Sequence, residues 1–281
     1  MKTSLEASYA YSRQIARSRA KNFYYAFLLL QKPQRNAMCA LYAFMRYCDD
    51  LSDDAAGGTT PQTMQRWRED MTAALDGKFN DHPVWPAFHD TVARYRIPHQ
   101  YFHDMLDGVS SDLEARKIET FDELYRYCYQ VASVVGLCTI HVFGFEDPRA
   151  LELAEKCGVA FQLTNIIRDV REDFELGRRY IPAEDLQRFG ADASKLERSS
   201  AWVEVLRYEG RRAREYYEES RPLMAMVHPK SRRSMWALVE IYWRLFQKIE
   251  SSGFDVFEQR LRLTTGEKLR VLGESFFRSA R

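Results

Sequence analysis

The sequence has no excess of charge of either sign and no long hydrophobic run. Lysine and arginine together number 41 against 40 aspartates and glutamates, so there is no electrostatic signature of a nucleic-acid partner. The longest apolar stretch, at about residues 23–30, is far shorter than the roughly 20 residues of a membrane-spanning helix. The polar N-terminal segment lacks the apolar centre of a secretory signal. These absences predict a cytoplasmic protein, which is compatible with attachment to a membrane surface.

Cysteine pairs and nucleotide-binding glycine motifs are also missing. The five cysteines form no Cys-x-x-Cys pair and mostly lie in apolar helical stretches, so we interpret them as reduced core residues. Neither G-x-G-x-x-G nor a P-loop occurs. His99 and His103 are four residues apart, but no Glu-x-x-His or cysteine partner accompanies them. An exposed helix face explains this pair better than a zinc site does.

Helical periodicity is present almost throughout. Apolar residues recur at i, i+3, i+4 and i+7, and convincing alternating strands are absent. Prolines mark several helix starts, Thr120 followed by Glu123 resembles a capping box, and no flexible linker divides the chain. We therefore predict a single all-α domain over residues 1–281. The predicted helices span residues 4–31, 34–53, 61–76, 83–94, 98–108, 120–144, 147–175, 200–226, 230–251 and 265–279.

The helix predicted over residues 34–53 carries a polar stripe at its end. Tyr42, Arg46, Asp49 and Asp53 stand at i, i+4, i+7 and i+11, which places them on one face. Two carboxylates ~5–6 Å apart at an effective dielectric of about 20 repel by roughly 3 kcal/mol, so water, an arginine or a cation must offset them. Mg²⁺ suits such a pair, because it binds one or two carboxylates and completes its shell with phosphates and water. A solvated acidic helix end is the alternative interpretation.

A second stripe lies in the helix predicted over residues 147–175. Gln162, Asn165, Asp169 and Asp173 again follow i, i+3, i+7 and i+11. Apolar residues flank the stripe, and burying amides and carboxylates without partners is costly. If the two stripes face each other, their four carboxylates require cations, and a bridging diphosphate is the matching ligand. The alternative interpretation is that the stripe is the solvent-exposed side of an amphipathic helix.

Two arginines lie beside these stripes. Arg46 and Arg168 are placed to bind phosphate oxygens with two parallel hydrogen bonds. Each of them is also placed to pair with a neighbouring aspartate, so both interpretations stay open at this point.

The chain closely resembles the squalene/phytoene synthase family over almost its whole length. The resemblance rests on Leu-Tyr-Ala-Phe at 41–44 with Asp49-Asp50-x-x-Asp53, on Tyr-Arg-Tyr-Cys-Tyr at 125–129, and on Gln-Leu-Thr-Asn-Ile-Ile-Arg-Asp-Val-x-x-Asp at 162–173. Gly-Arg-Arg-Tyr-Ile-Pro at 177–182 also follows the family pattern. The resemblance implies an all-α isoprenoid-synthase bundle with a central cavity.

The resemblance also implies a set of functional residues. Two or three Mg²⁺ ions would be held by Asp49, Asp53, Asn165, Asp169 and Asp173. The four aspartates and Tyr127 would be catalytic. Substrate contacts are implied at Arg19, Ala20, Lys21, Asn22, Tyr42, Arg46, Gln162, Arg168 and Tyr242. Ala20 and Asn22 depart from the small hydroxyl residues common in the family's flap, and Gln259 replaces an expected basic residue, with Arg260 beside it.

The implied reaction joins two allylic prenyl diphosphates head to head. Two farnesyl diphosphates would give presqualene diphosphate, with squalene or a dehydro product as the end point. Phytoene formation from two geranylgeranyl diphosphates is the alternative. A reductive end point needs NADPH, and the sequence leaves its use undecided, like the oligomeric state. Aromatic ring faces stabilise carbocations, and the candidates for this role are Phe23, Phe27, Phe44 and Tyr127. Each of them can also be read as an ordinary core aromatic.

Rival functions leave more unexplained. Terpene cyclases and chain-elongating prenyltransferases also use aspartate-rich helices, but they account less well for the Asn-x-x-Arg-Asp stripe. A non-catalytic scaffold relative should have lost aspartates, yet Asp49, Asp53, Asp169 and Asp173 are all present.

Overall fold

The structure is a computed structural model that describes residues 3–20, 23–53, 61–113 and 117–278. No β-strand occurs among these residues, which contain only two isolated bridges, Lys117 with Arg179 and Phe145 with Val227. The all-α prediction is therefore confirmed. The α-helices are α1 (Leu5–Arg19), α2 (Phe23–Phe27), α3 (Lys32–Asp53), α4 (Pro61–Leu75), α5 (Trp85–Tyr95), α6 (Gln100–Ser111), α7 (Phe121–Cys128), α8 (Val134–Phe143), α9 (Arg149–Glu175), α10 (Ala183–Phe189), α11 (Ser200–Ser220), α12 (Leu223–Met226), α13 (Arg232–Ser251) and α14 (Thr265–Arg278).

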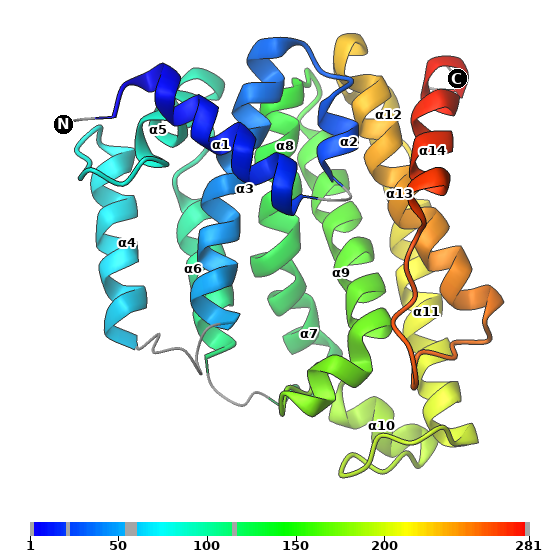
Figure 1. The fold of residues 1–281 in the computed structure, drawn as a ribbon. Helices are drawn as coiled ribbons and strands as arrows, with labels where there is room; N and C mark the ends of the chain where they lie inside the picture. The colour runs from blue at the N-terminus through cyan, green and yellow to red at the C-terminus, as the bar shows by residue number, and fades with distance from the viewer. Residues whose placement is uncertain (1–2, 21–22, 54–60, 114–116, 279–281) are drawn as a thin grey trace.

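The long helices stand side by side around a shared hydrophobic core (Figure 1). The helices α3, α6, α8, α9 and α13 surround the centre, α1 crosses one end, and α11 packs along the outside of α9. Both acidic stripes lie toward the C-terminal ends of their helices, and α3 and α9 end at the same end of the bundle (Figure 1). The fold therefore gathers the charged ends of two helices that are far apart in sequence.

Local signals explain several helix boundaries. Thr120 accepts a hydrogen bond from the Glu123 amide at 3.4 Å, as its capping-box pattern predicts. The Glu123 carboxylate reaches back to the amide of Glu119, one residue earlier than expected. Pro61 opens α4, and Pro148 directly precedes α9.

Four elements differ from the sequence prediction. The helix predicted over 200–226 is interrupted at residues 221–222, between α11 and α12. The stretch predicted as one helix over 4–31 is divided, because α1 ends at Arg19 and the backbone of Ala20 leaves the helical region. The predicted 120–144 helix contains a π-helical turn, η2 (Tyr129–Ser133), between α7 and α8. The short helix α10 was not predicted, since seven residues carry too little periodicity to stand out.

Two predictions about residue environment can be checked. All five cysteines are buried and free, as expected for reduced core residues. Among the described residues, no helix combines the length and apolar character needed to cross a bilayer.

Candidate functional site

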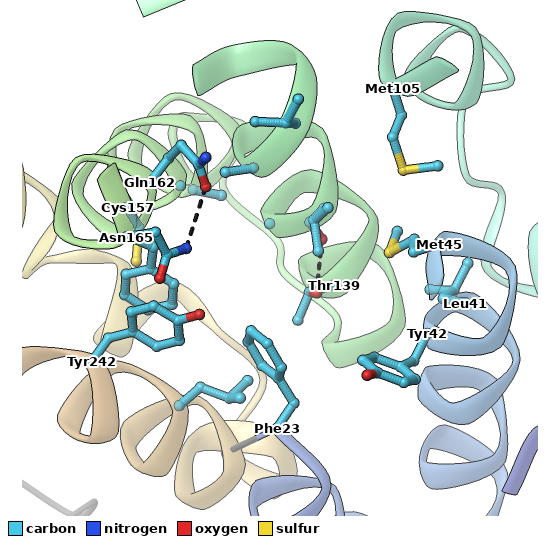
Figure 2. A pocket seen from close by; sticks show the side chains of 18 of the residues that line it. Phe23, Leu41, Tyr42, Met45, Met105, Thr139, Cys157, Gln162, Asn165 and Tyr242 are labelled. Carbon is cyan, nitrogen blue, oxygen red and sulfur yellow. Dashed lines mark hydrogen bonds between the residues drawn. The ribbon is translucent and has the colours of Figure 1, made fainter. Parts of the chain in front are cut away.

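A cavity of about 360 Å³ lies between α3, α6, α8, α9 and α13, close to the common end of the two acidic stripes. Its wall is mostly apolar, and its polar groups include members of both stripes (Figure 2). Figure 2 shows Tyr42 and Met45 of α3 across the cavity from Gln162 and Asn165 of α9. Polar lining residues are Tyr42, Arg46, Asp49, Asp112, Tyr127, Thr139, Gln162, Asn165 and Tyr242.

On α3, three members of the predicted stripe line the cavity. Tyr42, Arg46 and Asp49 follow one another at helical spacing, as predicted. Arg46 forms an ion pair with Asp50 one turn on, while its Nε is buried without a hydrogen-bond partner. Arg46 is thus paired with a neighbouring aspartate and still carries a donor at the cavity wall. Asp53 is the last residue of α3, and its side chain lies outside the described part of the chain.

On α9, the amides of the stripe line the cavity. Asn165 Nδ2 donates to Gln162 Oε1 at 3.3 Å, whereas Asn165 Oδ1 is buried and accepts no hydrogen bond. A buried, unpartnered amide oxygen costs about 1–3 kcal/mol, so this atom calls for a ligand with positive charge or a donor.

The carboxylates further along α9 are surrounded by charge. Arg168 donates to both oxygens of Asp169, and Arg260 Nη2 lies 2.7 Å from Asp169 Oδ2. Arg260 also contacts Glu172 at 3.0 Å. Burial, with the negative charge of Asp169 and Asp112 added, raises the pKa of Asp173 to about 7.

Arginines therefore occupy part of the second acidic stripe. Arg168 pairs with Asp169, which is the structural alternative left open by the sequence. Arg260, the neighbour of Gln259, also contacts Asp169. Within the described ranges, no group of three or more His, Cys, Asp or Glu side chains is close enough to hold a metal by itself. Any ion bound here would need further ligands, as expected when phosphate oxygens complete its shell.

A carboxylate that the sequence analysis missed also lines the cavity. Asp112 follows the last residue of α6 and accepts hydrogen bonds from Tyr127, at 2.9 Å, and from Tyr180, at 2.8 Å. The two rings stack with centroids 4.7 Å apart. Tyr127 lines the cavity as predicted, and burial followed by the charge of Asp112 raises its pKa well above the ordinary value. Asp112 has no periodic signal, because it lies at a helix end.

Aromatic residues form another part of the wall. Tyr242 stacks on Phe161 with ring centroids 4.1 Å apart and packs against Phe23. Phe23 and Phe27 line the cavity, as proposed for cation-facing residues. Phe44 does not, since it is fully buried and stacked on Phe88 in the core, so its ordinary core interpretation is correct.

The predicted flap residues are resolved in part. Arg19 is exposed at the end of α1, and Ala20 is buried. Neither residue lines the cavity. Lys21 and Asn22 lie outside the described residues. The structure thus places no described flap residue at the cavity wall.

An all-α bundle whose apolar cavity opens onto carboxylates and arginines defines a helical synthase for anionic, hydrocarbon-tailed substrates. The chain belongs to the squalene/phytoene synthase family, whose sequence profile matches residues 16–267. It is accordingly a prenyltransferase, and the family joins prenyl diphosphates head to head and uses a divalent metal with these substrates.

Individual relatives fall on both sides of the family. The chain is 36% identical to a phytoene synthase from Arthrospira platensis over 94% of this chain and 91% of that protein. It is 33% identical to a 15-cis-phytoene synthase from Synechocystis sp., covering 98% of this chain and 86% of that protein. Among solved structures, it resembles a dehydrosqualene synthase in complex with ligand, with a TM-score of 0.89 and 29% identity over 97% of this chain and 96% of the other. Squalene synthase HpnC from Alicyclobacillus acidocaldarius gives a TM-score of 0.82 and 26% identity over 89% and 95% of the two chains.

Proposed function

We propose that the protein condenses two farnesyl diphosphates head to head, with magnesium, to the cyclopropylcarbinyl product presqualene diphosphate. The observation that carries this proposal is the meeting of two chemically different environments in one cavity. Apolar and aromatic walls fit prenyl chains, while Asp49, Arg46 and Asn165 at one end fit diphosphate and its metal ions.

The residues at this end fit a hard divalent cation. Asn165 Oδ1 is buried and unpartnered, and burial, with the nearby charge of Asp169, raises the pKa of Asp173. All candidate ligands are oxygen donors, as Mg²⁺ prefers. We propose that two or three ions are held by Asp49, Asp53, Asn165, Asp169 and Asp173 together with the diphosphates. When bound, the metal supplies charge neutralisation that assists departure of diphosphate.

The protein's own side chains do the remaining work. Arg46, Tyr42 and Gln162 line the cavity and orient the diphosphates, which fixes the reacting carbons relative to each other. The apolar wall excludes water that would otherwise capture an allylic cation. The aromatic rings of Phe23, Phe161 and Tyr242 line the cavity and would favour positive charge there.

The length of the cavity favours the C15 substrate. Its lining extends from Met38 to Asp49 on α3 and from Ala154 to Asn165 on α9, a separation of eleven residues in each case. At ~1.5 Å per residue, this corresponds to roughly 16 Å. With C–C bonds near 1.5 Å, the twelve-carbon main chain of an extended farnesyl group is about 14 Å long, and the sixteen-carbon main chain of a geranylgeranyl group is about 19 Å long.

Phytoene formation from two geranylgeranyl diphosphates is the second candidate. It is favoured by the 36% identity to a phytoene synthase over nearly the whole chain. A C20 chain would have to bend within the cavity or displace part of its wall.

Product analysis tests the proposal. The purified protein is incubated with magnesium and either farnesyl or geranylgeranyl diphosphate, each with and without NADPH. We expect diphosphate release and presqualene diphosphate from the C15 substrate, and the NADPH pair shows whether the reaction continues to squalene. A larger kcat/KM for the C20 substrate would select the second candidate. No diphosphate release from either substrate would indicate a non-catalytic relative.

A further inference from the structure

A carboxylate and two tyrosines form a hydrogen-bonded cluster where three segments of the chain meet. The Asp112 backbone amide donates to the carbonyl oxygen of Val109, so the residue is fixed at the end of α6. Its Oδ2 accepts from Tyr127 on α7, and its Oδ1 accepts from Tyr180, 68 residues away. Tyr127 and Tyr180 are only 3% and 6% exposed, so water competes little for either phenol. Both carboxylate oxygens are therefore engaged by buried donors.

The segment that carries Tyr180 comes directly after the second acidic stripe. The amide of Arg178 donates to the Asp173 carbonyl oxygen at 2.8 Å, and the amide of Ile118 donates to the Arg179 carbonyl oxygen at 3.2 Å. The hydrogen bond from Tyr180 to Asp112 thus links the end of α9 to the end of α6 across the charged end of the cavity.

We propose that Asp112 is a positioning residue for the condensation, which holds the Tyr127 hydroxyl at the reacting end of the cavity, and that Tyr180 acts through it. This inference rests on the proposed function. Asp112 and Tyr127 both line the cavity, whereas Tyr180 does not, so Tyr180 can affect chemistry only through its contacts.

The cluster also has an electrostatic consequence. A phenol that donates to a carboxylate has a more negative oxygen, because hydrogen bonds in one chain polarise each other. Such an oxygen, fixed in an apolar cavity, stabilises positive charge that develops nearby and needs no reorganisation to do so. Asp112 therefore contributes to rate through the orientation and polarity of Tyr127.

Two conservative variants test the inference, because each removes one part of the cluster. In Asp112→Asn, the amide keeps the size of the side chain but presents one donor and one acceptor where two acceptors are needed. We expect kcat to fall about 10- to 100-fold, the usual range for groups that orient a functional residue, with KM changed less than about threefold. Tyr180→Phe should lower kcat in the same direction. The double variant should be no slower than Asp112→Asn alone, because both changes disable the same unit.

Tyr125→Phe is the matched control. Tyr125 lies on the same helix as Tyr127 and donates to a carboxylate, Glu155, at 2.5 Å, but it does not line the cavity. It should lose stability without losing kcat. Wild-type kcat in folded Asp112→Asn or Tyr180→Phe protein would overturn the inference, and so would losses that multiply in the double variant.

Hydrogen–deuterium exchange tests whether the cluster holds its segments in place, independently of the reaction. Exchange in residues 121–128 and 178–182 should be faster in Asp112→Asn than in wild type or Tyr125→Phe. Unchanged exchange there would overturn the inference even if the enzyme is active. If wild-type protein releases no diphosphate from either substrate, the proposed function fails, and the exchange comparison alone decides whether Asp112 positions Tyr127.

Discussion

Polar side chains along the α9 stripe differ in whether they have partners. Arg168 and Asp169 pair with each other, whereas Asn165 Oδ1 is buried without a partner and Asp173 has a pKa raised toward neutrality by burial. Under the proposed function, an ion would supply Asn165 Oδ1 with a partner that it otherwise lacks, whereas at Asp169 it would compete with Arg168.

The first prediction concerns pH and magnesium. Burial, then Asp169 and Asp112, raise the pKa of Asp173 to about 7, well above its unfolded value near 3.9. The metal-free protein therefore keeps a proton there between about pH 4 and 7 and loses the associated stability as pH rises through 7. Because Mg²⁺ must displace this proton, its half-saturating concentration should rise about tenfold per unit below pH 7 and be flat above pH 8. The half-saturating magnesium concentration is measured by steady-state kinetics at each pH.

The control for this prediction is Asp173→Asn. It should lower kcat/KM more than ~100-fold, beyond the usual cost of a group that only orients a ligand, and should abolish the dependence of magnesium affinity on pH. A half-saturating magnesium concentration that stays constant from pH 5.5 to 8.5 in wild type would show that Asp173 is not a ligand.

Residue spacing identified part of this site from sequence. Helical periodicity correctly placed Tyr42, Arg46 and Asp49 together, and Gln162 with Asn165, because α3 and α9 are long and regular. Asp112 and its link to Tyr180 were missed, because the two hydrogen bonds of Asp112 join residues 15 and 68 positions apart at element ends, where periodicity carries no information.

At the scale of elements, α9 and η2 pack closely against each other at Gly158. A Cβ added to Gly158 would be 2.4 Å from the Ser133 Cα and 2.7 Å from its amide nitrogen, so backbone would have to move. Since η2 contributes Val131 and Ala132 to the cavity, this glycine lets α9 approach and shapes the wall.

The second prediction follows from this contact. Gly158→Ala should lower stability by about 1–3 kcal/mol through overpacking and lower Tm by roughly 3–10 °C, as measured by calorimetry. Gly273→Ala is the control, because nothing lies within 4 Å of the added Cβ and alanine favours helix α14. Equal Tm values for the two variants would contradict the packing argument.

The third prediction concerns a buried acidic pair that joins α10 to α11. Glu209 and Asp185 are almost fully buried, Arg212 lies 2.5 Å from Asp185 and 2.7 Å from Glu209, and Glu209 Oε2 accepts no hydrogen bond. Burial, opposed by Arg212 and reinforced by Asp185, raises the pKa of Glu209 to about 8. The protonated acid stabilises the fold at low pH, and this contribution is lost as pH rises through 8.

Glu209→Gln should therefore flatten the pH dependence of Tm between pH 6 and 9. Each pH unit over which only the folded protein keeps the proton lowers the free energy of unfolding by about 1.4 kcal/mol. The Tm of the wild type should therefore fall over this pH range by roughly 3–8 °C more than the Tm of the variant. Glu204→Gln on the same helix removes only an exposed pair with Arg207 and should leave the profile unchanged. If the Tm of the Glu209→Gln variant changed with pH as steeply as that of the wild type, Glu209 would be ionised over the whole pH range.

Element prediction from sequence succeeded where helices are long and failed where the backbone changes locally. The division between α1 and α2 and the π-turn η2 depend on packing that periodicity does not record. The helix α10 is held by pairing of residues 117–119 with residues 179–184, a contact distant in sequence.

At the scale of the whole molecule, the cavity's length is expected to select the substrate. Met38 lines the cavity eleven residues before Asp49, at the end away from the charged groups. The fourth prediction is that Met38→Ala raises the ratio of C20 to C15 kcat/KM, by about tenfold for ~1.4 kcal/mol of relieved contact. Competition between the two substrates measures this ratio.

Met71→Ala controls for stability. Met71 is fully buried but does not line the cavity, so both variants should lose about 2–5 kcal/mol, while only Met38→Ala changes selectivity. An equal ratio in both variants would place the chain-length limit elsewhere in the wall.

The most direct test of the account is a crystal structure with magnesium and the unreactive farnesyl S-thiolodiphosphate. We predict diphosphate and its ions between the ends of α3 and α9, with Asp49 and Asn165 Oδ1 among the contacts and the prenyl chain running toward Met38. A diphosphate bound outside this cavity, or bound inside it without an ion near Asp49 or Asn165, would contradict the account.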